Sequence, residues 1–128
     1  MKDRKKMYLS LPVSGRDLRS VKVFAKRVKQ KWERKGYEVV TPFEVTEIFD
    51  GVREGQDYYA FCMGKCVEAL LKCDGVSMCQ EWFNSKGCRT EWNVAETYGI
   101  KRVLDDTKYI GGYSDAENNP IQGKQERN

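Results

Sequence analysis

Apolar and polar residues alternate in short blocks along the first hundred positions of the chain. Short apolar runs closed by turn residues predict buried strands, and apolar residues spaced three and four positions apart predict helices. On this basis we expect strands over 7–11, 37–41, 74–79 and 100–104. Helices are expected over 17–35, 58–72 and 88–98, and loops over 43–56 and 81–87.

Strands that alternate with helices predict an α/β fold. We expect a flavodoxin-like, doubly wound parallel sheet of four to five strands with helices on both faces. Ligands of such sheets bind beyond the carboxyl ends of the strands, where the segments 10–16 and 80–91 should converge. Residues 1–104 would form this domain. The polar, Gly- and Asn-containing residues 105–128 are expected to be an irregular or mobile tail.

Composition supports a single compact domain. The chain has 128 residues, of which 40% are hydrophobic and 33% charged. Its apolar runs are all much shorter than the ~20 residues of a transmembrane helix, so we expect a soluble, cytoplasmic protein without membrane contact. Five cysteines occur without any histidine or C-x-x-C pair, which favours free thiols over a metal site. No cofactor is expected.

Positive charge is concentrated in the first predicted helix. Nine Lys and Arg lie between Arg16 and Lys35, against Asp17 and Glu33. Such a segment is typical either of nucleic-acid binding or of a solvated helix face. Aromatic stacking residues are not interleaved with these charges, which favours the solvated face.

Glu91 is the main candidate for chemistry. In a helix over 88–98, it shares the apolar face of Cys88, Ala95 and Tyr98. Burying a carboxylate on the core-facing side of a helix costs free energy, so such a residue is expected to have hydrogen-bonding partners or a catalytic role. The helix N-terminus should lower its pKa and keep it an anion, as a nucleophile at a sugar carbon must be. An ordinary first-turn acid stabilised by the helix dipole gives the same pattern.

Two turns could bind phosphate at the same edge of the sheet. Backbone N–H groups, a hydroxyl and a positive charge at a helix start form such a site. One turn contains Ser85, Lys86 and Gly87, and the other contains Ser14, Gly15 and Arg16. Ser and Gly are also common turn and cap residues, so each turn alone has a purely structural explanation.

Three motifs together resemble the nucleoside 2-deoxyribosyltransferase superfamily. Tyr8-Leu-Ser-Leu-Pro12, followed by Ser14-Gly15, is similar to its opening pattern Y-x-[S/A]-G-P-x-x-G. Residues 68–74 resemble its helix-to-strand segment, which ends in an Asp. Residues 81–95 resemble G-W-x-x-S-x-G-x-x-x-E-x-x-x-A, the most specific of the three.

The resemblance implies roles for individual residues. Glu91 matches the glutamate that attacks the anomeric carbon, and Tyr8 matches the tyrosine that holds it by a hydrogen bond. Transferases of free nucleosides have an Asp six positions before the nucleophile, whereas deoxynucleoside monophosphate N-glycosidases have a Ser there. In this chain the residue at that position is Ser85. A nucleotide is therefore the expected ligand. The substrate-binding set is Ser10, Pro12, Ser14, Gly15, Arg16, Trp82, Ser85, Lys86 and Gly87.

The chain departs from the family pattern at two positions. Leu11 replaces the glycine of the opening motif, and Cys66 falls where the family has an active-site aspartate that helps to protonate the leaving base. A thiol is a weak substitute for that carboxyl. The sequence therefore leaves three functions open: an N-glycosidase or deoxyribosyltransferase, a catalytically impaired nucleotide-binding module, and a basic protein that binds nucleic acid or a partner. The family also implies a homo-oligomer.

Overall fold

A computed structural model describes residues 4–13, 15–46 and 56–108 of the chain. Four parallel strands form one sheet in the order β2-β1-β3-β4. They are β1 (Lys6–Ser10), β2 (Glu38–Val40), β3 (Gly75–Met78) and β4 (Lys101–Leu104). The predicted doubly wound sheet is confirmed, and the strand order changes direction between β1 and β3.

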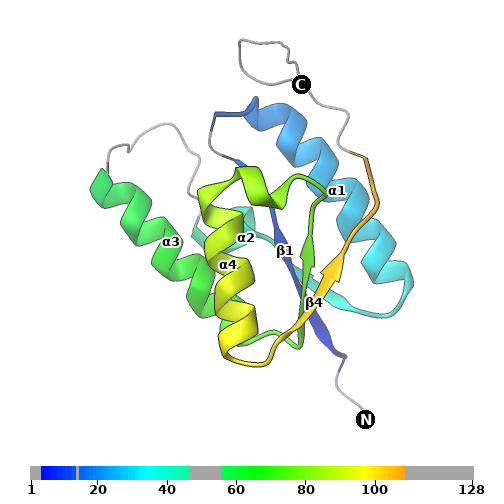
Figure 1. The fold of residues 1–128 in the computed structure, drawn as a ribbon. Helices are drawn as coiled ribbons and strands as arrows, with labels where there is room; N and C mark the ends of the chain where they lie inside the picture. The colour runs from blue at the N-terminus through cyan, green and yellow to red at the C-terminus, as the bar shows by residue number, and fades with distance from the viewer. Residues whose placement is uncertain (1–3, 14, 47–55, 109–128) are drawn as a thin grey trace.

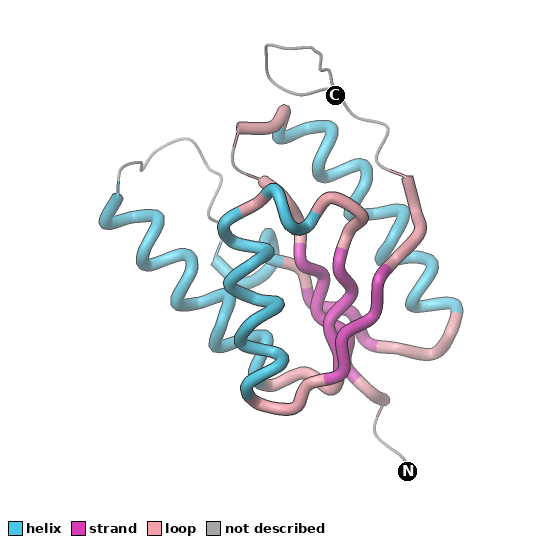
Figure 2. The backbone as a smooth tube through the Cα atoms, viewed as in Figure 1, coloured by secondary structure: helices cyan, strands magenta, loops and turns pink. Residues whose placement is uncertain are grey.

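Helices cover both faces of the sheet. The helices are α1 (Leu18–Arg34), α2 (Pro42–Thr46), α3 (Gln56–Leu71) and α4 (Lys86–Thr97), with a short 3₁₀ turn η1 (Trp82–Asn84). As Figure 1 shows, α1 packs on one face, and α4 with α3 beside it packs on the other. The strand ends and the loops that follow them meet at one edge, shown in Figure 2. None of the helices in the described residues combines the length and apolar character of a bilayer span.

The sequence explains why α1 lies where it does. Its buried side chains recur at helical spacing, as predicted: Val21, Phe24, Ala25, Val28 and Trp32. The Asp17 carboxylate caps its start by accepting a hydrogen bond from the Ser20 backbone N–H. The chain leaves the helix through Gly36, whose φ of 95° is easily adopted only by glycine.

The prediction of a loop over 43–56 is wrong at its first residues. Pro42–Thr46 form α2, because Thr41-Pro-Phe-Glu44 is a helix-start signal. The Glu44 side chain accepts a hydrogen bond from the Thr41 backbone N–H at 3.0 Å, as in a capping box. The middle of that predicted loop lies outside the described residues.

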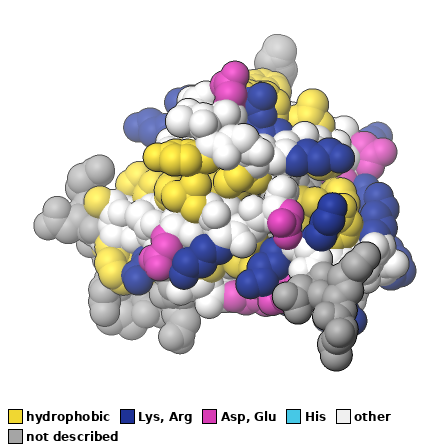
Figure 3. Space-filling view, turned by 90° about the horizontal axis from the view of Figure 1, so that it is seen from below, with side chains coloured by type: hydrophobic (Ala, Val, Ile, Leu, Met, Phe, Trp, Pro, Cys, Tyr) yellow, Lys and Arg dark blue, Asp and Glu magenta, His cyan; other side chains and the backbone are white. Residues whose placement is uncertain are grey.

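Two basic residues of α1 form ion pairs with neighbouring acids. Lys29 pairs with Glu44 at 2.6 Å, and Lys31 pairs with Asp105 at 2.6 Å. On the face formed by the helix carboxyl ends, Lys and Arg side chains are interspersed with acidic ones (Figure 3). The two ion pairs of α1 favour a solvated helix face over a continuous nucleic-acid surface.

The first residues after β4 pack against the domain. The backbone N–H of Asp105 donates to the Met78 carbonyl, and its buried carboxylate is held by Lys31 and by Thr107. Residues 109–128, which make up most of the predicted tail, lie outside the described residues.

Candidate active site

Glu91 is buried where β1 meets α4. Only 4% of its surface is exposed, and it shares the buried face of α4 with Cys88 and Ala95. The Tyr8 hydroxyl donates to Oε2 of Glu91 at 2.7 Å, and the Ser10 hydroxyl donates to Oε1 at 2.6 Å. Each carboxylate oxygen therefore has its own donor, and both donors come from β1.

The expectation that the helix N-terminus keeps Glu91 ionised is wrong. Burial raises the pKa of Glu91 to about 8, although the hydrogen bonds from Ser10 and Tyr8 act in the opposite direction. The cost of removing a carboxylate from water exceeds the stabilisation from two donors. At neutral pH the resting side chain therefore carries a proton most of the time.

Ser10 is buried beside Glu91. It is 1% exposed, and its hydroxyl donates to Oε1 of Glu91 at 2.6 Å. It is also one of the groups that lower the pKa of Cys88. The sequence predicted Ser10 as a substrate contact, and in the structure its hydroxyl donates to Glu91.

Cys88 and Cys79 form a pair of thiols beside Glu91. Cys79 directly follows β3, and Cys88 lies in the first turn of α4, where its backbone N–H donates to the Ser85 side chain. Hydrogen bonding with the Cys79 side chain is the largest cause that lowers the pKa of Cys88 to about 7. The same contact and burial raise the pKa of Cys79.

Cys66, which was predicted to stand at the position of an active-site aspartate, lies beside Tyr8. Burial raises the pKa of the Cys66 thiol to about 11, and burial also raises the pKa of Tyr8 well above its usual value. Both groups are therefore neutral hydrogen-bonding partners at physiological pH. Glu68 and Asp57 are the other acids predicted to be able to protonate a leaving base in place of Cys66. Glu68 is exposed and pairs with Lys65 and Lys72, and the side chain of Asp57 lies outside the described residues.

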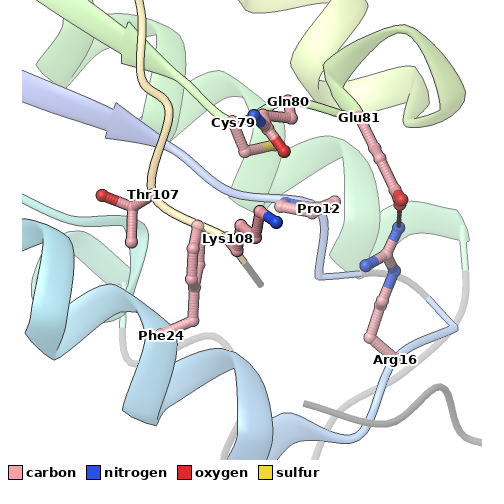
Figure 4. A pocket seen from close by; sticks show the side chains of 8 residues that line it. All are labelled: Pro12, Arg16, Phe24, Cys79, Gln80, Glu81, Thr107 and Lys108. Atoms are coloured by element: carbon pink, nitrogen blue, oxygen red, sulfur yellow. Dashed lines mark hydrogen bonds and ion pairs between the residues drawn. The ribbon is translucent and has the colours of Figure 1, made fainter. Parts of the chain in front are cut away.

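A cavity of about 160 Å³ opens beyond the carboxyl ends of β1, β3 and β4 (Figure 4). The Arg16 guanidinium crosses to Glu81 at 3.0 Å, which joins the two segments that were predicted to converge. The Arg16 side chain is only 8% exposed, whereas that of Glu81 is 48% exposed. The cavity lining is Pro12, Arg16, Phe24, Cys79, Gln80, Glu81, Thr107 and Lys108.

The predicted phosphate-binding residues occupy two turns, and of these residues Arg16 lines the cavity. Ser85 is the N-cap of α4, which begins two residues before the predicted start, at Lys86. Lys86 is exposed and Gly87 half-buried. In the other turn, Gly15 is exposed with a φ of 77°, and Ser14 lies outside the described residues. Phosphate binding by these groups stays a prediction.

Trp82 has an aromatic partner within the protein. Its ring stacks on Trp92 at a centroid distance of 4.2 Å, and the Arg102 guanidinium lies 4.1 Å from the Trp92 ring. A half-buried structural aromatic has contacts of this kind. The predicted contact between Trp82 and a base or sugar stays untested.

Sequence reasoning missed several residues of the cavity wall. Phe24 is spaced as a core residue of α1, and Gln80, Thr107 and Lys108 belong to no motif. Cys79 and Cys88 were both predicted as free thiols, and their spacing did not show that one affects the pKa of the other. Gln80 and Glu81 lie in the segment 80–91, which the sequence placed at this edge, although neither was predicted as a site residue.

Together the fold and site define an α/β protein with a doubly wound parallel sheet and a buried carboxyl group held by the first strand. Residues 5–104 match the family described as "Domain of unknown function (DUF4406)", and the chain belongs to that family. A comparison with curated proteins finds no match.

Among solved structures, the chain is similar to a 2-deoxyribosyltransferase from the psychrotolerant bacterium Bacillus psychrosaccharolyticus. The TM-score is 0.59 at 20% sequence identity, over 77% of this chain and 70% of that one. At this identity, the similarity establishes the shared fold.

Proposed function

We propose that the protein cleaves the N-glycosidic bond of a 2′-deoxynucleoside 5′-phosphate, with Glu91 as the nucleophile. The observation that carries this proposal is the buried Glu91 carboxyl group, with Tyr8 and Ser10 on its two oxygens. Two donors from a rigid strand hold the carboxyl group in one orientation, as nucleophilic attack requires. The similarity in fold to a 2-deoxyribosyltransferase supports the same reaction class.

The proposed reaction has two steps. The Glu91 carboxylate attacks the anomeric carbon, and the electron pair of the broken carbon–nitrogen bond leaves with the base, which takes up a proton. A covalent deoxyribosyl-enzyme results. Water then attacks the anomeric carbon and loses a proton, which releases the sugar phosphate and restores the carboxylate. A second base in place of water would give transfer.

Positive charge near the cavity supports a phosphorylated substrate. Arg16 forms part of the cavity wall, and Lys108 lines it as well. In the proposed complex, the substrate phosphate competes with Glu81 for the Arg16 guanidinium, which binds phosphate in a bidentate manner. Ser85 and the first backbone N–H groups of α4 provide further donors.

The direct experiment is chromatography of the protein with each deoxynucleoside and its monophosphate, with free base as the product measured. We expect base release from a monophosphate, and loss of that release in Glu91→Gln. The matched control is Glu96→Gln, because Glu96 lies on the exposed side of the same helix. Equal turnover by Glu91→Gln and the unmodified protein would remove Glu91 from the mechanism.

The second candidate is a nucleotide-binding module without turnover, and Cys66 is the observation that favours it. Its neutral thiol occupies the position from which the family's aspartate helps to protonate the leaving base. This function predicts that a deoxynucleotide raises the unfolding temperature without base release. Replacing Cys66 with Asp should then produce base release, and no gain would contradict the role assigned to that position.

We also propose that the protein forms a homo-oligomer. Four large apolar side chains are exposed on α3 and η1: Tyr59, Phe61, Leu71 and Phe83. Large apolar side chains exposed to water are candidates for a contact surface. Sedimentation velocity of the protein and of a Phe61→Ser variant measures this directly, and we expect the variant to shift toward the monomer.

A further inference from the structure

The segment that follows β4 is attached to α1 by polar contacts. Nζ of Lys31 lies 2.6 Å from Oδ1 of Asp105. One turn earlier on α1, the Arg27 guanidinium donates to the Lys108 carbonyl at 3.4 Å. Residues four positions apart share a face of a helix, so two side chains on one face of α1 hold residues 105–108 against the domain.

Asp105 is the buried end of this attachment. Its side chain is 2% exposed, and the backbone N–H and hydroxyl of Thr107 both donate to the same Oδ1 that Lys31 contacts. Within the part of the chain that the structure describes, the other oxygen, Oδ2, is buried without a hydrogen-bond partner. The carboxylate therefore depends on Lys31 as its counterion, because an unpaired buried charge is costly.

The attached segment forms one wall of the cavity beyond the strand ends. Thr107 and Lys108 both line this cavity, and so does Phe24 of α1. Figure 4 shows the Lys108 side chain at the cavity together with that of Arg16. A shift of the segment would therefore move the Lys108 ammonium relative to the Arg16 guanidinium.

A second ion pair on α1 provides a comparison. Lys29 contacts Glu44 at 2.6 Å, the same distance as between Lys31 and Asp105. The two lysine side chains are 31% and 29% exposed, whereas the Glu44 side chain is 47% exposed. Glu44 belongs to α2, and no described residue of α2 lines this cavity. The two pairs therefore differ in the segment that they hold rather than in the lysine.

We propose that Lys31 and Asp105 are positioning residues, which hold the Lys108 ammonium where it binds the phosphate of the ligand. This role rests on the proposed function, because that function gives the ligand its phosphate. Lys108 supplies a charge-assisted hydrogen bond to a phosphate oxygen, in addition to those of Arg16. Without Lys31, the Asp105 carboxylate moves toward water, and the segment carries Lys108 out of the cavity wall.

Inorganic phosphate is the probe, and it is titrated into the full chain by isothermal calorimetry at constant ionic strength. We expect Lys31→Met to weaken phosphate binding about tenfold, which corresponds to the loss of one charge-assisted contact. Lys29→Met is the matched control, because it removes the same charge from the same helix. Its phosphate affinity should equal that of the unmodified protein. Equal phosphate affinities in all three proteins would overturn the proposal.

Two further substitutions separate a positioning effect from a direct effect of the Lys31 charge on phosphate. If Lys31 acts through Lys108, then Lys31→Met combined with Lys108→Met should bind phosphate no more weakly than Lys108→Met alone. Asparagine needs no counterion, so Asp105→Asn should restore part of the affinity that Lys31→Met loses. Additive losses for the two lysines, or no recovery with Asp105→Asn, would contradict the positioning role.

Hydrogen exchange of the unmodified protein tests the proposal even if Lys31→Met does not fold. Phosphate that binds Lys108 should slow amide exchange in the peptide that contains residues 105–108, because a ligand stabilises the state that binds it. Unchanged exchange in that peptide, or no binding of phosphate to the unmodified protein, would overturn the proposal.

Base release reports on the proposed function separately. With a deoxynucleotide that is cleaved, Lys31→Met should raise KM for the monophosphate and leave KM for the corresponding deoxynucleoside unchanged, because only the former carries a phosphate. An equal rise in both KM values would refute the positioning role. Absence of base release from every nucleotide would reject the proposed function, and the phosphate titration would still decide the role of Lys31.

Discussion

Tyr8 and Glu91 are separated by 83 positions in the chain, yet the Tyr8 hydroxyl lies 2.7 Å from Oε2 of Glu91. Both side chains are buried, so neither group can exchange its partner for water without local opening. The contact joins the first strand to the last helix and sets the orientation of the carboxyl group. Ser10, two residues further along the same face of β1, does the same for the other oxygen.

Stability should fall as the pH rises toward 8. The folded-state pKa of Glu91 is about 8, above its usual value of 4.5, so between these values the folded state binds more protons than the unfolded state. The free energy of unfolding therefore decreases as the pH rises through this window, by on the order of a few kcal/mol, and levels off above it. Urea unfolding at pH 5 to 9 measures this decrease in the free energy of unfolding, for the unmodified protein and for Glu91→Gln.

Glu91→Gln is isosteric and carries no charge, so its stability should lack this decrease. Groups other than Glu91 titrate in both proteins and cancel in the comparison. If the two unfolding free energies run parallel over the whole range, Glu91 does not carry the raised pKa.

Base release should increase with pH up to about 8. In the proposed mechanism the carboxylate is the attacking form, and its fraction rises about tenfold per pH unit below the pKa of the group. Initial rates on the preferred deoxynucleotide, measured from pH 5.5 to 9, give the midpoint. A rate that is highest at pH 5.5 would show that the neutral carboxyl group is the active form.

Ser10→Ala and Ser77→Ala form a matched pair of buried substitutions. Ser10 donates to Glu91, so its removal should slow base release and lower the unfolding free energy by about 1 kcal/mol. In the described structure, the buried Ser77 hydroxyl has no hydrogen-bond partner. Its replacement by alanine should leave stability unchanged or increased. Chemical unfolding and base release of both variants test this, and equal effects at the two positions would contradict it.

Trp82→Leu should reduce stability more than substrate affinity. The ring stacks on Trp92, and such a pair contributes about 0.5–1.5 kcal/mol beyond the area that it buries. The control is Phe83→Leu, because the neighbouring Phe83 is 55% exposed. Thermal unfolding and KM for the deoxynucleotide are the measurements. A stable variant with a strongly raised KM would instead support the contact with a base or sugar.

Local sequence patterns determined the order and type of the main elements. The apolar spacing of α1 and the short apolar runs of the strands are local properties, so they can be read along the chain. They gave the parallel sheet and the edge at which 10–16 and 80–91 meet, now joined by Arg16 and Glu81. Glu91 and Tyr8 were also identified, from motif resemblance together with helical spacing. The missed α2 had a local signal as well, in Thr41-Pro-Phe-Glu44.

Only the tertiary structure decided the protonation of Glu91 and the partners of the thiols. The helix N-terminus is visible in the sequence. The burial that raises the pKa of Glu91 is not, because it arises only when β1, α3 and α4 pack together. The effect of Cys79 and Ser10 on the pKa of Cys88 likewise depends on how a strand end and a helix start are packed. Electrostatic energies vary steeply with distance and solvent exposure, and these are set by folding rather than by residue order.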